Sequence, residues 1–342
     1  MDPTWIVFAG MGAVGAGLIA NSLTRRRAPS NGTSARAPAV DSEARADAPS
    51  NSAPASAQPE TRRASDSESE SERAPVAAAK PDALPPARAE DDQVEDPTGP
   101  IALILVTAHG RTDQGRHRTT NEDSFLVDPH RHLFAICDGM GGHAAGEVAS
   151  QLAVETIARA HRTNQFDGEP DPSRPRRGDQ LARSILMANR AVYDKAREDA
   201  RYYGMGTTAV AARFSPNKQR VYIAHVGDSR CYRMREGNLR QITKDHTLGS
   251  LGVQGPTAGK LVRAVGTELK VEVDLLTDAP ESGDRYMLCS DGLSRMVPNE
   301  SIESILCEEK DLDAAAAKLI GAANEAGGRD NITVILVRVD EA

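Results

Sequence analysis

Four acidic side chains stand where they could hold a metal ion. Asp138, Asp228 and Asp291 each follow an apolar run, and Asp330 stands just before one. If these runs are buried strands whose ends converge, the carboxylates would repel one another, and burying them unpaired would be very costly. A divalent cation removes that cost. Because the donors are oxygens, the pattern favours a hard cation such as Mg²⁺ or Mn²⁺ over Zn²⁺.

Each aspartate taken alone has a simpler interpretation, because Asp-Gly is a common turn dipeptide. The glycine-rich segment DGMGG at 138–142 does not end in Gly-Lys-Ser/Thr, so it is not a nucleotide-binding phosphate loop. Its glycines would instead let backbone carbonyls approach a metal ion closely. The metal hypothesis therefore depends on the four aspartates acting together.

The elements that must position these carboxylates are strands in runs, with a few helices between them. Apolar and alternating segments predict strands and hairpins at 101–110, 124–139, 206–214, 220–229, 229–242, 285–293 and 331–339. Apolar residues at helical intervals predict helices at 144–161, 179–200 and 311–328. There is no regular strand–helix alternation, which favours antiparallel sheets packed together with helices outside.

Composition divides the chain into unequal parts. Residues 28–100 hold 11 of the 20 prolines, no aromatic residue, and 7 basic against 14 acidic side chains, a net charge of −7. Such a segment cannot bury enough apolar surface to offset its chain entropy, so we predict a disordered acidic linker. Residues 101–342 are predicted to form one large domain. Their 31 basic and 34 acidic side chains, net −3, argue against a nucleic-acid partner.

The N-terminal segment predicts a membrane anchor at residues 1–27. Residues 4–23 carry no charge, and three arginines follow at 25–27. An apolar span of this length can cross a bilayer as a helix. Positive charge after the span keeps the C-terminal side in the cytoplasm, so we expect a single-pass protein of the inner (cytoplasmic) membrane with a cytoplasmic catalytic domain. A helix lying on the membrane surface is the alternative.

Six segments occur in an order that is specific to one family. They are RTTNEDSF (118–125), CDGMGGHAAGE (137–147), GMGTTAVAA (204–212), VGDSRCYRMREGNLRQITKDHT (226–247), LCSDGLS (288–294) and GRDNITVILV (328–337). Together they resemble the bacterial metal-dependent type 2C (PPM family) Ser/Thr protein phosphatases over about residues 103–340. The resemblance implies an α+β fold, a central sandwich of two antiparallel β-sheets flanked by α-helices.

The resemblance also implies a ligand set for Mn²⁺ or Mg²⁺. Asp138 corresponds to the carboxylate that bridges two metal ions, and the carbonyl of Gly139 to a ligand of the first ion. Asp291 and Asp330 correspond to ligands of the second ion. Asp228 matches a residue that, with Asp291, helps to hold a third ion in bacterial members.

Three more residues acquire roles from the resemblance. Glu122 matches a residue that reaches a metal through water, and Asp123 a neighbour that supports the loop. Arg118 matches the arginine that binds the substrate phosphate, a role that suits the forked guanidinium. The alternative is a structural arginine that balances nearby acids of its polar loop, Asp113, Glu122 and Asp123.

Two features depart from the family pattern. Met140 stands where animal members place a His after Asp-Gly as a candidate general acid, and His143 is nearby. Residues 248–266 are shorter than the usual flap, which affects substrate choice and the surroundings of the third ion. His225 and His246 are interpreted as structural.

The activity implied by the resemblance is hydrolysis of phosphoserine and phosphothreonine in cytoplasmic proteins by a metal-activated water, with Arg118 and Asp138 as the catalytic pair. The expected partners are phosphorylated proteins and the Ser/Thr kinases that this enzyme opposes. Two alternatives stay open: a phosphatase dedicated to a phosphorylated anti-sigma antagonist, and a non-catalytic scaffold that keeps the fold.

Overall fold

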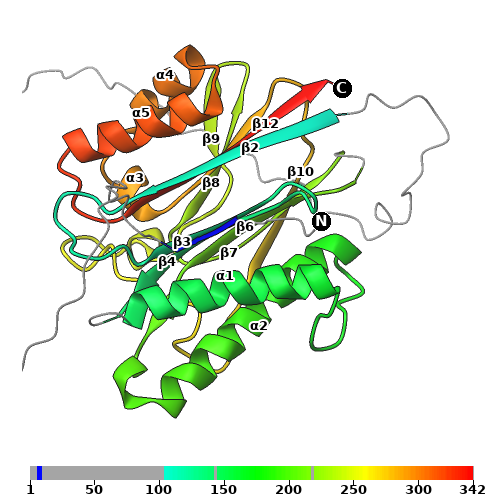
Figure 1. Cartoon of the computed structure of the whole chain (residues 1–342), viewed down its shortest axis with the longest axis vertical. Coiled ribbons are helices and arrows are strands. Elements are labelled where there is room, and N and C mark those ends of the chain that lie inside the picture. Colours follow the sequence, from blue (N-terminus) through cyan, green and yellow to red (C-terminus); the bar gives the residue numbers. More distant parts are fainter. Residues whose placement is uncertain (1–5, 10–103, 142–144, 217–218, 342) are drawn as a thin grey trace, which may run out of the picture. The chain divides into compact units, whose positions relative to one another are not determined.

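The computed structural model describes residues 6–9, 104–141, 145–216 and 219–341, and these build two antiparallel sheets (Figure 1). The first sheet runs in the order β1 (Ile6–Ala9), β3 (Asp123–Asp128), β4 (Leu133–Met140), β6 (Ala209–Phe214), β7 (Val221–Val226) and β10 (Asp274–Asp278), with β5 (Gly206–Thr207) paired to β4. The second runs in the order β2 (Ile104–Asp113), β12 (Ile332–Glu341), β11 (Arg285–Cys289), β8 (Arg230–Arg235) and β9 (Asn238–Gln241).

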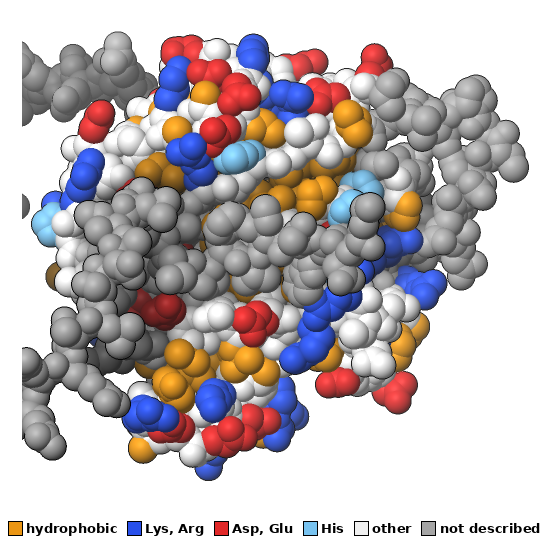
Figure 2. Space-filling view, in the orientation of Figure 1, with side chains coloured by type: hydrophobic (Ala, Val, Ile, Leu, Met, Phe, Trp, Pro, Cys, Tyr) orange, Lys and Arg blue, Asp and Glu red, His pale blue; other side chains and the backbone are white. Residues whose placement is uncertain are grey.

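Helices cover the outer face of each sheet. The α-helices are α1 (Ala145–Thr163), α2 (Arg176–Glu198), α3 (Asp291–Ser294), α4 (Asn299–Glu308) and α5 (Leu312–Glu325), and the short 3₁₀ helices are η2 (Ala200–Tyr202) and η3 (Gly249–Leu251). Helices α1 and α2 lie against the first sheet, and α4 and α5 lie on the opposite side of the molecule against the second (Figure 1). On the face in Figure 2, acidic and basic side chains are interspersed over these helices, as expected where the polar side of an amphipathic helix meets solvent.

The core has three parts that follow from this layering. Phe125, Phe134, Phe214 and Tyr286 pack between the two sheets, where Phe214 makes edge-to-face contacts with Phe134 and Tyr286. A second cluster lies between the first sheet and helices α1 and α2, and a third lies between the second sheet and helices α3 to α5. The predicted α+β sandwich with helices outside is therefore confirmed.

Some elements differ from those predicted. Strand β10 and helix α4 were not expected, and residues 291–293, predicted as the end of a strand, belong to helix α3. Among the described strands β10 pairs with β7 alone, at the edge of its sheet. Four of its five residues are only partly buried, so it leaves little apolar signal in the sequence. Helix α4 buries only Ile302 and Leu306 completely, which is too narrow a stripe to stand out.

The N-terminal predictions fall largely outside the described residues. The linker at 28–100 lies wholly outside them, as does His143. Within the predicted transmembrane segment, residues 6–9 are described, and they form strand β1 against β3 where a helix was expected. The physical reason is local: Ile, Val and Phe favour strands, and the edge of β3 offers backbone partners. Across the described parts of the chain, no helix is long and apolar enough to span a membrane.

Candidate metal centre

Strand ends from both sheets bring the four predicted aspartates to one cavity. Asp138 lies near the end of β4, Asp228 follows β7, Asp291 begins α3 directly after β11, and Asp330 precedes β12. Strands β11 and β12 are antiparallel, so the end of one meets the start of the other at the same sheet edge. All four line a cavity of about 290 Å³, together with Arg118, Glu122 and Gly139.

The aspartates destabilise one another's charged forms. Burial raises the pKa of Asp138 well above its ordinary value, and the charges of Asp123, Asp291, Asp330 and Asp228 raise it further. Burial also raises the pKa of Asp291 to about 6, although the nearby Arg295 opposes this shift. A site that concentrates buried negative charge in this way suits a cation.

Gly139 is required by the close approach of three chain segments. A Cβ atom at this position would lie 2.1 Å from the carbonyl oxygen of Gly146 in α1 and 2.6 Å from that of Glu122. The Gly139 N–H donates a hydrogen bond to the same Glu122 oxygen, 3.1 Å away. Only glycine therefore allows β4, α1 and the loop before β3 to meet beside the cavity.

Glu122 and Asp123 take different positions next to the aspartates. Glu122 lines the cavity, where burial raises the pKa of its carboxyl and Arg118 opposes the shift. Asp123 is buried behind it, and its Oδ2 accepts hydrogen bonds from Ser290 Oγ at 2.8 Å and Thr333 Oγ1 at 2.6 Å. These contacts join β3 to β11 and β12 across the two sheets, which suits the supporting role expected of Asp123.

The other carboxylate oxygen of Asp123, Oδ1, is buried and has no hydrogen-bond partner among the residues that the structure describes. Burial raises the pKa of this carboxyl to about 7. An unpartnered buried oxygen beside a cluster of carboxylates fits a centre that takes up further positive charge or an ordered water.

Thr208 is a positioning residue that the sequence pattern did not single out. Its hydroxyl accepts a hydrogen bond from the Asp138 N–H at 3.0 Å, and its own N–H donates to the Asp138 carbonyl at 2.9 Å. The same hydroxyl lies 2.7 Å from Ser229 Oγ, next to Asp228. Thr208 thus holds the backbone of Asp138 in place and ties it to the residue that follows Asp228. Its position in the GMGTT segment was the only signal that could have pointed to it.

Arg118 lies at the cavity wall, but its ion-pair partner is not one of the three acids of its own loop. Its Nη2 donates to Asp330 Oδ2 at 2.8 Å, across 212 residues of sequence. This hydrogen bond raises the pKa of Arg118. The side chain is 48% exposed, so the guanidinium can meet a phosphate that enters the cavity.

His225 and His246 lie behind the turn that carries Asp228. Their rings stack with centroids 4.5 Å apart, and both approach Asp274. The Gly227 N–H donates to His246 Nδ1 at 3.1 Å, which places the His246 proton on Nε2, facing Asp274. A nitrogen that carries this proton cannot bind a metal, so the arrangement supports the structural role expected of His246, against which the ring of His225 stacks.

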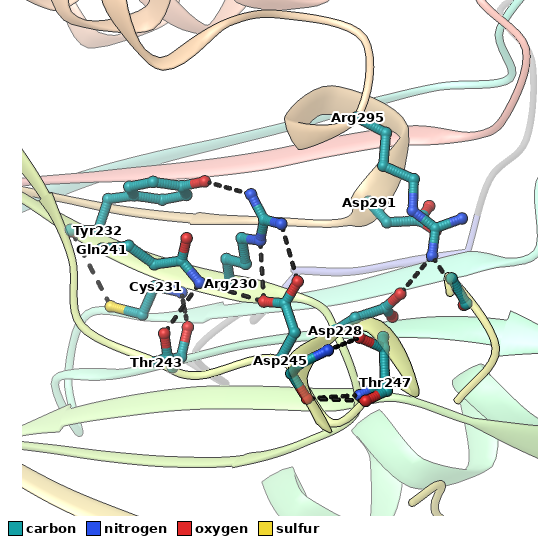
Figure 3. A network of polar contacts seen from close by, with 12 residues as sticks. Asp228, Arg230, Cys231, Tyr232, Gln241, Thr243, Asp245, Thr247, Asp291 and Arg295 are labelled. Carbon is teal, nitrogen blue, oxygen red and sulfur yellow. Dashed lines mark hydrogen bonds and ion pairs between the residues drawn. The ribbon is translucent and has the colours of Figure 1, made fainter. Parts of the chain in front are cut away.

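Arg295 is a second residue that sequence reasoning missed. It follows α3, and its guanidinium lies between Asp228 and Asp291 (Figure 3). The distances are 2.5 Å from Nη2 to Asp228 Oδ2 and 2.9 Å from Nη1 to Asp291 Oδ2. The only local signal is the spacing of four residues between Asp291 and Arg295, which is common on helix surfaces.

Known proteins resemble this chain both in sequence and in structure. A family model described as protein phosphatase 2C matches residues 112–333. Serine/threonine phosphatase stp of Listeria welshimeri is 39% identical over 246 residues, which is 67% of this chain and 94% of the relative. Serine/threonine protein phosphatase PstP of Mycobacterium tuberculosis is 39% identical over 253 residues, 70% of this chain and 46% of the relative. The crystal structure of the PstP catalytic domain in complex with two manganese ions is similar, with 36% identity and a TM-score of 0.60, over 70% of this chain and 100% of that one.

Proposed function

This chain belongs to the protein phosphatase 2C family of Ser/Thr protein phosphatases, and we propose that it dephosphorylates phosphoserine and phosphothreonine in cytoplasmic proteins, in opposition to Ser/Thr kinases. The observation that carries the proposal is the convergence of four aspartates from both sheets on one cavity beside Arg118. A phosphomonoester dianion that enters the cavity adds further negative charge. It can bind there only if cations offset the negative charge of the carboxylates.

The donors in the cavity fit Mn²⁺ or Mg²⁺. The carboxylates of Asp138, Asp291 and Asp330 and the backbone of Gly139 would hold two ions, and PstP, a relative, is described with two manganese ions. Among the described residues that line the cavity, none is a His or a Cys, which disfavours Zn²⁺. When bound, such ions neutralise phosphate charge and activate water for hydrolysis.

The protein's own groups then have distinct tasks. Arg118 binds phosphate oxygens with its forked donors and thereby orients the phosphorus toward the aspartates. Asp138 supplies the central negative charge of the site, and Thr208 holds its backbone. Asp123 links the two sheets behind the site by accepting hydrogen bonds from Ser290 and Thr333.

Phosphate release from synthetic peptides tests the proposal. The full-length chain with Mn²⁺ or Mg²⁺ is expected to release phosphate from phosphothreonine and phosphoserine peptides, and excess EDTA is expected to stop it. A phosphotyrosine peptide of the same sequence is the matched control and should be a poor substrate. Full activity in excess EDTA would rule out the metal mechanism, and equal activity on phosphotyrosine would rule out the substrate class.

We also propose that residues 1–27 tether the enzyme to the cytoplasmic membrane, with the catalytic domain in the cytoplasm. The support is the uncharged run at 4–23 followed by three arginines. Residues 6–9 cannot pair with β3 and also lie in a bilayer, so the tether requires β1 to leave the sheet.

Cell fractionation distinguishes these two states of the N-terminus. We expect the full-length protein in the membrane fraction, and a protein without residues 1–27 in the soluble fraction with unchanged kcat/KM. A full-length protein that is already soluble would contradict the tether and favour strand β1. A periplasmic signal from a reporter fused to the C-terminus would contradict the proposed orientation.

A further inference from the structure

The guanidinium of Arg295 joins the buried carboxylate of Asp228 to the partly buried carboxylate of Asp291. Besides its contacts to Asp228 and Asp291, its Nη2 donates to the carbonyl oxygen of Gly259 at 3.3 Å (Figure 3). Its donors thus reach three separate segments, namely the turn after β7, the start of α3, and the loop between η3 and β10. The positive charge lies between Asp228 and Asp291, the two carboxylates that the family resemblance assigns to a third metal ion.

We propose that Arg295 is a built-in cation that takes the place of a third metal ion, so that this phosphatase works with two ions only. The inference rests on the proposed function and concerns the metal content of the same site. It makes Arg295 a positioning residue, which holds Asp228 and the Gly259 loop at the edge of the cavity.

Charge and geometry support this assignment. Asp228 is buried, so its carboxylate needs a compensating charge in any state of the protein. A guanidinium is always protonated, and its planar fork can donate to two carboxylates at once. Arg295 is also tethered four residues from Asp291, so it is present without any association step from solution.

A metal ion between Asp228 and Asp291 would have to displace the guanidinium. The guanidinium nitrogens already occupy the facing oxygen of each carboxylate, Asp228 Oδ2 and Asp291 Oδ2, and an ion that left them in place would also be repelled by the charge of Arg295. Displacement would also break the hydrogen bond to the carbonyl oxygen of Gly259, which lines the cavity. Arg295 therefore competes directly with a third ion for Asp228 and Asp291.

Metal stoichiometry tests the proposal without relying on turnover. Full-length wild-type protein and Arg295→Gln are dialysed against a series of Mn²⁺ concentrations, and bound manganese is measured by mass spectrometry. We expect two ions in the wild type. Arg295→Gln should gain a third ion, with an affinity at least about tenfold tighter than any third ion in the wild type, because the competing charge is gone. Gln keeps much of the side-chain volume, and Arg295→Lys is a second variant that keeps the charge and should retain two ions.

Two controls separate this site from adventitious binding to an acidic chain. Arg190→Ala removes an exposed ion pair with Asp194 on α2 and should leave the stoichiometry at two. Asp228→Asn added to Arg295→Gln should remove the gained ion. Equal third-ion affinity in wild type and Arg295→Gln would overturn the inference, as would a gained ion that survives Asp228→Asn. A failure of the proposed function would look different, because it would leave phosphopeptides intact whatever the number of bound ions.

Discussion

Replacing Asp138 with Asn is expected to lower kcat at least about a hundredfold, because the variant loses the charge at the centre of the metal site. The same change is expected to make the metal-free protein more stable at pH 8. Asp138 is partly buried beside Asp123, Asp228, Asp291 and Asp330, and all of them disfavour its ionised form. An amide of the same size removes that repulsion.

The pH dependence of this stabilisation follows from the direction of the pKa shift. The folded state raises the pKa of Asp138 above the unfolded value of about 3.8, so above that pH the folded protein binds more protons than the unfolded chain. Its stability therefore falls as the pH rises through the window between the two pKa values. The stabilisation by Asp138→Asn should be largest at pH 8 and should shrink as the pH falls through this window, because the wild-type carboxyl then takes up its proton.

Thermal unfolding in EDTA and in excess Mn²⁺ measures both effects. Mn²⁺ should raise the Tm of the wild type much more than that of Asp138→Asn. Asp194→Asn is the matched control, since Asp194 is an exposed carboxylate on α2, and it should change neither kcat nor the response to Mn²⁺. Near-normal turnover of Asp138→Asn with metal in excess would show that the site lies elsewhere.

Replacing Arg118 with Ala is expected to lower kcat/KM about ten- to a hundredfold, mainly through a higher KM for a phosphopeptide. Losing one charge-assisted, forked contact costs roughly 1.5–3 kcal/mol. The contact is made to the phosphate in both ground and transition states, so kcat should change less than KM. Arg118→Lys should recover only part of the loss, because an ammonium keeps the charge without the fork.

The ion pair with Asp330 provides the competing explanation for Arg118. If the arginine only orients Asp330, Arg118→Ala should leave KM unchanged and raise the Mn²⁺ concentration needed for half-maximal rate. The pair is partly exposed, so its loss should hardly move the Tm in either case. Arg111→Ala, which removes a similarly exposed pair with Asp313, is the control and should leave the kinetics unchanged. An unchanged KM in folded, metal-loaded Arg118→Ala would refute phosphate binding.

Local sequence was sufficient to predict most of the elements and the four aspartates of the site. Strands β4, β7, β11 and β12 contain apolar runs that are easily recognised in the sequence. Asp138 lies in β4, and Asp228, Asp291 and Asp330 lie two residues from the other three strands. A charged side chain in or beside an apolar run would be costly to bury. This mismatch appears within a few residues of sequence, so it can be recognised without knowledge of the fold. The order of the six motifs then indicated the sandwich.

Only the tertiary structure decided how the site is held together. Asp123 accepts hydrogen bonds from Ser290 and Thr333, and Arg118 pairs with Asp330. The two partners of each contact are 167 to 212 residues apart in the sequence. Arg295 meets Asp228 because α3 and the turn after β7 arrive at the same cavity. No local pattern encodes such contacts, since they depend on the packing of one sheet against the other or, for Arg118 and Asp330, on the pairing of β2 with β12. The same reason applies to residues 6–9, where the free edge of β3 allowed a short apolar run to pair as a strand.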